Sequence, residues 1–185
     1  MLAFPNANEG FPKFSAATSH QVTAEERVTA IDFVNRHNFL FEEFDTKKLL
    51  TTQLPEMTLY HMYGHFKGAE AVKDFIESKY PPLIPGVTRH ATNHIVDRDN
   101  ETGGVVVRYH MTLVRQAWPE EAGKVTTKDA FEATGLPGIW IYSAVVDRLK
   151  MTDDGWKLYS RINGSTVVNK SLNPGASEAS KKNVD

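Results

Sequence analysis

A carboxylate interrupts an apolar strand pattern in the C-terminal half of the chain, at Asp147. Residues 138–150 and 155–162 are rich in β-branched and aromatic residues and are joined by a polar tetrapeptide, which predicts a long hairpin. Strand alternation places Asp147 on a largely apolar face. It either forms a salt bridge, with Arg148 or Arg161 as partner, or faces a pocket and hydrogen-bonds a developing oxyanion.

Seven histidines supply side chains that titrate near neutral pH. His61 falls in a strand expected over 57–63, and His90 in a strand expected over 87–96. Either imidazole suits proton abstraction or donation. The alternatives are a strand-end histidine bonded to solvent or backbone for His61, and a hydrogen-bonded core histidine for His90. His37 lies in a predicted helix, where ordinary packing is the alternative to a functional role.

The histidine spacing argues against a metal site. His90 and His94 share a predicted strand face, but about 13 Å of extended chain separates them, too far for one ion. His61 and His65 flank a glycine turn without an evident third ligand. The sequence also lacks a Gly-x-Ser-x-Gly motif, a P-loop and a dinucleotide fingerprint. We therefore expect no metal, no serine nucleophile and no cofactor.

Helices are expected first along the chain. Thr23-Ala-Glu-Glu26 has the pattern of a capping box, and apolar residues recur at helical spacing from Val28 to Phe41. Asp45 can cap a second short helix over 46–52, and a third helix is expected over 69–80.

Strands follow. They are expected over 57–63, 87–96 and 105–118 and in the C-terminal hairpin, with a turn over 64–68. Residues 119–137 exceed an ordinary hairpin loop, which favours a lid or a mobile excursion with one helical turn at 128–132. Helices grouped before meandering strands predict an α+β fold, in which a strongly bent antiparallel sheet wraps against helices and leaves an apolar hollow.

Composition narrows the function further. The 185 residues are 41% hydrophobic, carry a formal net charge of −2 and include no cysteine. We expect one domain over 23–168, an irregular arm over 1–22 and a disordered tail over 169–185. Scattered basic residues argue against nucleic acid as a partner. Without a signal peptide or an apolar span, we expect no membrane partner and a cytoplasmic location.

Several short motifs together resemble a known family. Phe66-Lys-Gly68 opens a predicted helix, Arg89-His90 opens a predicted strand, and Asp147 is followed by Asp153-Asp-Gly-Trp156 and then Arg161. This order is similar to the SnoaL-like branch of the nuclear transport factor 2-like superfamily, which includes ketosteroid isomerase, scytalone dehydratase and polyketide cyclases. The resemblance covers about residues 23–168. It implies an α+β cone with a deep pocket, commonly dimeric through the outer face of the sheet.

The resemblance also implies site residues. His61 falls where isomerase-like members place a general-base carboxylate, Asp147 where they place a neutral oxyanion-hole aspartic acid, and His37 near their oxyanion-hole tyrosine. Glu42 and His90 fall where dehydratase-like members pair an acid with a histidine. Histidines thus replace a carboxylate and a tyrosine, and a glutamate stands where aspartate is usual, so the steroid reaction itself is not implied.

We therefore expect a cofactor-free isomerase, cyclase or dehydratase that acts by acid–base chemistry on a small apolar polyketide- or terpenoid-like substrate, in specialised metabolism. His61 or His90 would move the proton, and the other, with Asp147 or His37, would stabilise the enolate oxygen. Aromatic residues expected at the substrate are Phe41, Tyr109 and Trp140. The alternative is a non-catalytic ligand-binding or dimerisation module, since one fold serves both. A homodimer is expected in either case.

Overall fold

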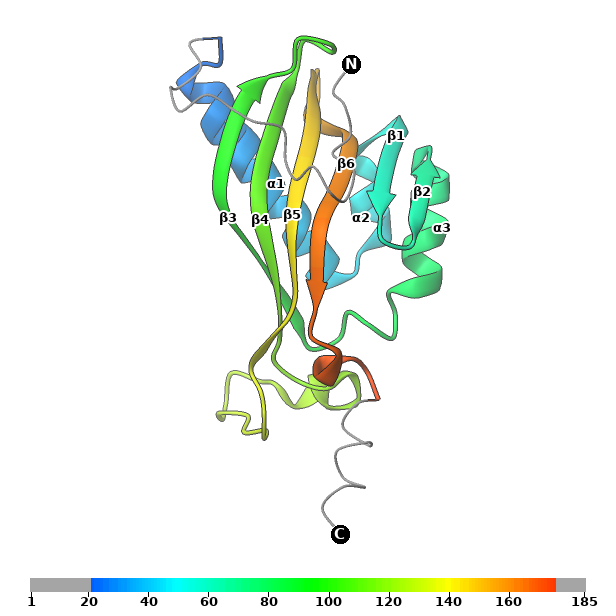
Figure 1. The fold of residues 1–185 in the computed structure, drawn as a ribbon, viewed down its shortest axis with the longest axis vertical. Helices are drawn as coiled ribbons and strands as arrows, with labels where there is room; N and C mark the ends of the chain where they lie inside the picture. The colour runs from blue at the N-terminus through cyan, green and yellow to red at the C-terminus, as the bar shows by residue number, and fades with distance from the viewer. Residues whose placement is uncertain (1–20, 176–185) are drawn as a thin grey trace.

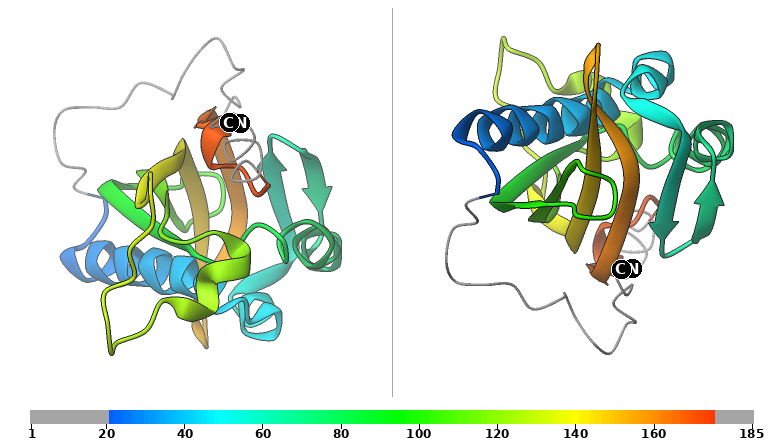
Figure 2. Two further views of the ribbon diagram at one scale, coloured as in Figure 1. Left: turned by 90° about the horizontal axis from the view of Figure 1, so that it is seen from below. Right: turned by 90° about the horizontal axis from the view of Figure 1, so that it is seen from above.

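Helices lie on one face of a curved six-stranded sheet in the computed structural model, which describes residues 21–175 (Figure 1). The helices are α1 (Ala24–Glu43), α2 (Thr46–Thr51) and α3 (Ala69–Lys79), with two 3-10 turns, η1 (Pro119–Lys124) and η2 (Lys170–Leu172). The strands are β1 (Gln53–His61), β2 (Gly64–Lys67), β3 (Val87–Arg98), β4 (Val105–Arg115), β5 (Gly138–Thr152) and β6 (Gly155–Val168). The α+β architecture is as the sequence predicts. Figure 2 shows α1 running along the sheet, with α3 beside β1 and β2.

The sheet is mixed, which corrects the expectation of a purely antiparallel one. Its strand order is β2-β1-β6-β5-β4-β3, and all neighbours are antiparallel except β1 and β6. Leu59 pairs with Arg161 and Tyr60 with Ile162 in that parallel ladder. The alternation of apolar residues predicts which face of a strand is buried, but it does not say which strand lies beside it.

The predicted turn over 64–68 is instead the strand β2, paired antiparallel with β1. The reversal occurs earlier, at residues 62–63, and His61 pairs with Gly64. The rings of Tyr60 and His65 stack across the two strands at 3.8 Å. As a result, His61 lies at the end of β1, where the chain turns.

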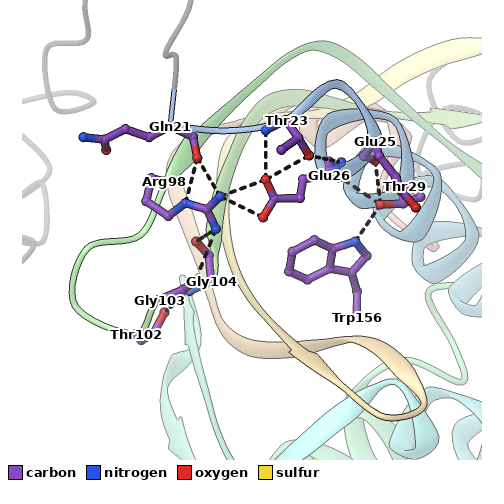
Figure 3. A network of polar contacts seen from close by, with 10 residues as sticks. All are labelled: Gln21, Thr23, Glu25, Glu26, Thr29, Arg98, Thr102, Gly103, Gly104 and Trp156. Atoms are coloured by element: carbon purple, nitrogen blue, oxygen red, sulfur yellow. Dashed lines mark hydrogen bonds and ion pairs between the residues drawn. The ribbon is translucent and has the colours of Figure 1, made fainter.

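The start of α1 is fastened by polar contacts (Figure 3). The predicted capping box is present: the Thr23 hydroxyl accepts from the Glu26 backbone N–H, and the Glu26 carboxylate accepts from the Thr23 backbone N–H. The same carboxylate binds Arg98 of β3 at 2.7 Å. Trp156 of β6 donates its indole N–H to the Thr29 hydroxyl. These contacts fix one end of α1 to both β3 and β6.

The core lies between α1 and the inner face of the sheet. Ala30 and Val34 of α1 are fully buried there, as are Val107, Val145 and Leu149 of the facing strands. Since Asp147 lies between Val145 and Leu149 in alternation, it shares this inner face, as predicted. On the outer face, a smaller cluster of Val106, Val146 and Ile162 is buried.

Two segments outside the main helices and strands differ from their predicted form. In the segment 119–137, helical structure is confined to η1, so the predicted helical turn at 128–132 is wrong. The chain after β6 is also more ordered than expected: Leu172 is buried, and its carbonyl accepts from Arg115 Nε at 2.7 Å. An isolated leucine in a polar sequence gives little sign of such packing. Residues 1–20 of the predicted irregular arm (1–22) and residues 176–185 of the predicted tail (169–185) lie outside the described residues.

None of the helices in residues 21–175 has the length and apolar character that crossing a membrane requires.

Candidate active site

A pocket with a cavity volume of about 160 Å³ opens beside the C-terminal half of α1. Its walls are mostly apolar and include Phe41, Leu59, Leu83, Ile84, Met111, Leu113, Trp140, Ile141 and Val168. Its polar side chains are His61, Tyr63, Tyr80, Arg89, Ser143, Arg161, Asn163, Thr166 and Asn173. Two of these are cations, and no aspartate or glutamate of the described residues lines the pocket.

His61 brings an imidazole into this wall from the end of β1. Its Nδ1 accepts a hydrogen bond from the Tyr63 backbone N–H at 3.3 Å, and its Nε2 lies 3.4 Å from the Tyr80 hydroxyl. The ring of Phe75, a buried residue of α3, packs against it at 5.2 Å between centroids. The turn after β1 and the end of α3 therefore hold the imidazole from both sides.

The surroundings of His61 keep its imidazole neutral. Burial and, secondarily, the nearby Arg89 charge lower the pKa of His61 to about 4. Because Nδ1 accepts from a backbone amide, the proton of the neutral ring sits on Nε2, where it points to the Tyr80 hydroxyl. Burial raises the pKa of Tyr80, against the opposing charges of Arg89 and Arg161. Both groups are thus neutral hydrogen-bonding groups at pH 7.

Arg89 contributes a guanidinium group with unusual surroundings. It lies over the ring of Phe41, with 4.8 Å between the guanidinium carbon and the ring centroid. Among residues 21–175 no carboxylate forms an ion pair with it, and its buried Nη1 has no hydrogen-bond partner. Burial lowers the pKa of Arg89 to about 10, so the group is charged at pH 7.

His90, the other predicted proton-transfer group, lies outside the pocket. It is exposed on the outer face of β3, where its Nε2 contacts the Thr88 hydroxyl at 3.1 Å. Glu42 does not orient it; the Glu42 carboxylate instead accepts from the backbone N–H of Arg89. The structure therefore does not bring the predicted Glu42–His90 pair together, and it turns the neighbouring Arg89 inward in place of His90.

A bulge explains why the predicted faces of β3 were wrong. The register slips between Thr92 and Ile95, and Asn93 has a left-handed φ of 58°. The extra residue reverses the alternation along the strand. His94 therefore points inward and stacks on Tyr109 at 5.3 Å between centroids, although His90 points outward.

Asp147 forms the salt bridge that the sequence offered as the alternative to an oxyanion role. Its carboxylate, which is 0% exposed, accepts two hydrogen bonds from Arg161, each of 2.7 Å, and one from the Tyr109 hydroxyl at 2.9 Å. Burial, the largest single effect, opposes the charge of Arg161, but Asp147 together with Tyr109 and Tyr80 outweighs it and raises the pKa of Arg161. Both carboxylate oxygens of Asp147 accept hydrogen bonds from Arg161 and Tyr109, so the contacts are those of a salt bridge and not of a donor to an oxyanion.

His37 is buried in α1 behind Phe41 and does not line the pocket. The Thr52 hydroxyl donates to the Leu49 carbonyl, so the His37 Nδ1–H donates to Thr52 Oγ1 at 2.8 Å. Its Nε2 then carries a lone pair and has no partner among the described residues. Burial, with smaller effects of Arg161 and Arg89, lowers the pKa of His37 well below its usual value.

Of the three aromatic residues expected at the substrate, Phe41 and Trp140 line the pocket, whereas Tyr109 lies behind it on Asp147 and Arg161. Contact of Phe41 and Trp140 with a substrate remains a prediction. Sequence reasoning did not assign a role to Arg89, Tyr80 or Asn163. The helical spacing of Tyr80 indicated that it faces inward. For Arg89, alternation with Val87 indicates the inner face, but alternation counted back from Val96 indicates the opposite one, so the sequence alone does not decide.

Among residues 21–175, no three side chains of histidine, cysteine, aspartate or glutamate are arranged to hold one metal ion. No residue of the segment 119–137, the predicted lid, lines the pocket.

Comparisons with known proteins agree on the fold. A family profile described as "SnoaL-like domain" matches residues 22–162. A comparison with curated proteins finds no match.

Solved structures with similar folds include Aln2 from a Streptomyces species, at 15% identity and a TM-score of 0.62, covering 77% of this chain and 91% of that one. A candidate scytalone dehydratase from Novosphingobium aromaticivorans is 18% identical with a TM-score of 0.57, covering 82% and 93%. ActVI-ORFA from Streptomyces coelicolor is 12% identical with a TM-score of 0.58, covering 74% and 95%. At these identities the similarity concerns the fold.

Proposed function

The chain belongs to the SnoaL-like domain family, and we propose that it is a cofactor-independent acid–base enzyme acting on a small, largely apolar carbonyl compound. The reaction is an isomerisation, a cyclisation or a dehydration of a polyketide- or terpenoid-like substrate. One observation carries the proposal: the neutral His61–Tyr80 pair stands in the wall of an otherwise apolar pocket. Solved structures of similar fold include a candidate scytalone dehydratase, which supports the same class of reaction.

The pair acts on a substrate oxygen. The His61 Nε2–H donates a hydrogen bond to the Tyr80 oxygen. The Tyr80 hydroxyl hydrogen is then free to form a hydrogen bond to the substrate carbonyl or to a leaving hydroxyl. A neutral imidazole serves better here than an imidazolium, because its conjugate base matches the basicity of an enolate more closely. Apolar walls exclude water and strengthen these hydrogen bonds. The α-proton itself passes to a water molecule from solvent and returns from solvent when the ketone re-forms, so the pair stabilises the enolate oxygen and both groups end in the protonation state in which they began.

Enolisation gives a test that requires no knowledge of the final product. The protein is incubated in D₂O with a panel of cyclic ketones and β-hydroxy ketones, and loss of the α-proton signals is followed by NMR. We expect accelerated exchange for at least one compound. His61→Ala should slow that exchange by about 10²- to 10³-fold, the usual contribution of a donor to a developing oxyanion, because Tyr80 loses the hydrogen bond that orients its hydroxyl.

His90→Ala is the matched control, since it removes an imidazole from the outer face of the sheet. It should leave the exchange rate unchanged. Unchanged exchange in both His61→Ala and Tyr80→Phe, with both variants folded, would remove the proposed pair from the mechanism. Ketones that bind without any exchange would favour the non-catalytic ligand-binding module.

A further inference from the structure

Arg89 differs from the other deeply placed arginines in what it binds. Arg161 is bonded to Asp147 and Tyr109, and Arg148 is bonded to Asp99 and Glu101. Arg115 donates to backbone carbonyls, including that of Leu172. The Arg89 guanidinium has neither kind of partner in residues 21–175, and its Nη1 is buried.

Arg89 is half-buried, and the charge of Glu42, whose carboxylate binds the Arg89 backbone N–H, offsets only part of the cost of desolvating the guanidinium, since the pKa of Arg89 is still lowered. Buried polar groups that lack partners are rare in folded proteins, and a bound ligand or water is one explanation for each of them. Arg89 also lines the pocket, with its flat face on Phe41. Its free hydrogen-bonding edge is therefore available to a molecule in the pocket.

The rest of the pocket defines what such a molecule looks like. Arg161 also reaches the wall, but Asp147 behind it pairs with its charge, so Arg89 is the lining cation that has no ion-pair partner among the described residues. Phe41, Trp140 and Tyr80 supply aromatic surface. The Asn163 Oδ1 is a further buried polar atom that has no hydrogen-bond partner within residues 21–175. A flat, apolar frame with a single negative group matches this combination better than a phosphate, which needs more donors than one free guanidinium edge provides.

We propose that the pocket recognises its substrate as an anion, and that Arg89 binds the carboxylate of a planar, unsaturated ring compound. The guanidinium fork pairs with the two carboxylate oxygens, while the ring system lies against Phe41 and Trp140. This inference rests on the proposed function for the identity of the pocket as the substrate site, but it adds that the substrate is charged before any proton moves.

Isothermal titration with two probes of equal shape tests the proposal. The probes are 2-naphthoate and its neutral isostere 2-naphthamide. We expect the wild-type protein to bind the carboxylate about 10- to 100-fold more tightly, as for a hydrogen-bonded charge. In Arg89→Gln the two probes should bind within about twofold of each other, because the amide side chain cannot pair with the charge.

Arg36→Gln removes the same charge from an exposed site and is the matched control. It should retain the full preference for the carboxylate. Arg89→Lys, which keeps the charge, should retain part of it. Equal binding of the two probes by the wild-type protein, absence of binding by either, or an undiminished preference in folded Arg89→Gln would overturn the proposal.

The outcome is separable from the test of the proposed function. Probe binding does not require proton transfer, so His61→Ala should preserve the preference for 2-naphthoate even if it abolishes exchange. Loss of the preference with His61-dependent exchange intact would refute only the anion subsite.

Discussion

Arg161 and Arg89 approach the ring of Phe41 from β6 and β3, at 5.9 and 4.8 Å from the guanidinium carbon to the ring centroid, yet their surroundings differ. Arg161 is neutralised by Asp147 and further bonded to Tyr109. Arg89 has no ion-pair partner in residues 21–175. The first arginine belongs to the framework of the sheet, because its bonds join β6 to β4 and β5. The second is held in position by packing and keeps its hydrogen-bonding capacity for a ligand.

The largest effect on stability should come from breaking the ion pair between Asp147 and Arg161. Asp147→Asn leaves the Arg161 charge buried and uncompensated, and we expect a loss of about 3–5 kcal/mol in the free energy of unfolding. Urea unfolding measures it. The double variant Asp147→Leu/Arg161→Met removes both charges and should recover most of the loss. A loss below about 1 kcal/mol in Asp147→Asn would mean that Arg161 does not depend on its carboxylate, and the contrast with Arg89 would fail.

Acid should destabilise the folded domain, because His61 and His37 are held neutral in it. His61 and His37 have lowered pKa values in the folded state, so the unfolded chain takes up protons first as the pH falls. Their contribution to stability is complete above about pH 6.5, the usual histidine value, and is lost as the pH falls towards about 4, the pKa of His61.

Between pH 7 and pH 4.5 we expect these two groups to lower the free energy of unfolding by on the order of 1–3 kcal/mol. Urea unfolding at the two pH values measures the change. Acidic side chains also titrate in this range, so the decisive comparison is with His61→Phe, in which the acid-induced loss should be smaller. An equal loss in that variant would show that His61 is not held neutral by its surroundings.

Replacing Arg89, the arginine without an ion-pair partner in residues 21–175, should change the free energy of unfolding little. Arg89→Met keeps apolar packing on Phe41 and leaves no stranded carboxylate, so we expect a change within about 1 kcal/mol, in either direction. Urea unfolding beside Asp147→Asn gives the direct comparison. A loss as large as that of Asp147→Asn would show that Arg89 is part of the framework after all.

The smallest effect concerns the pKa of His61, the histidine near Arg89. The charge of Arg89 is the secondary cause, after burial, of the low pKa of His61. Arg89→Met should therefore raise the pKa of His61 above about 4 but leave it below the usual value, as an NMR titration of the ring protons can measure. The exposed Arg36→Gln should leave it unchanged. No rise in Arg89→Met would place the guanidinium too far away to act on the pair.

The sequence was sufficient where short-range patterns decide the structure. The capping box at Thr23 and the helical spacing after it located α1, and alternation placed Asp147 on the buried face with a cation nearby. The motif of Arg89 and His90 opens β3 as expected, but the predicted site residue His90 lies outside the pocket, whereas Arg89, which was assigned no role, lines it. These features depend on residues close together in the chain, which is why they could be predicted.

The remaining errors arise from effects that the local pattern does not contain. The bulge at Asn93 shifts the alternation of β3 by one residue, so a face defined by Val96 cannot be extended back to His90. The parallel pairing of β1 with β6 depends on the whole topology. Whether a polar group lacks a partner also depends on all of its neighbours. The sequence does not show that Asp147 pairs with Arg161 and leaves Arg89 without a carboxylate, among the described residues, in hydrogen-bond contact with its guanidinium.

The parallel ladder of β1 and β6 has a consequence for how the protein is made. The Thr58 and Ser160 hydroxyls are hydrogen-bonded across a separation of 102 residues. During translation β1 must therefore wait for almost the entire domain to leave the ribosome before its neighbour exists, since contacts this distant in the chain form late. The pocket that His61 lines is consequently completed late in folding. Until then its apolar side chains are exposed to solvent, where chaperones can bind them or other chains can aggregate with them.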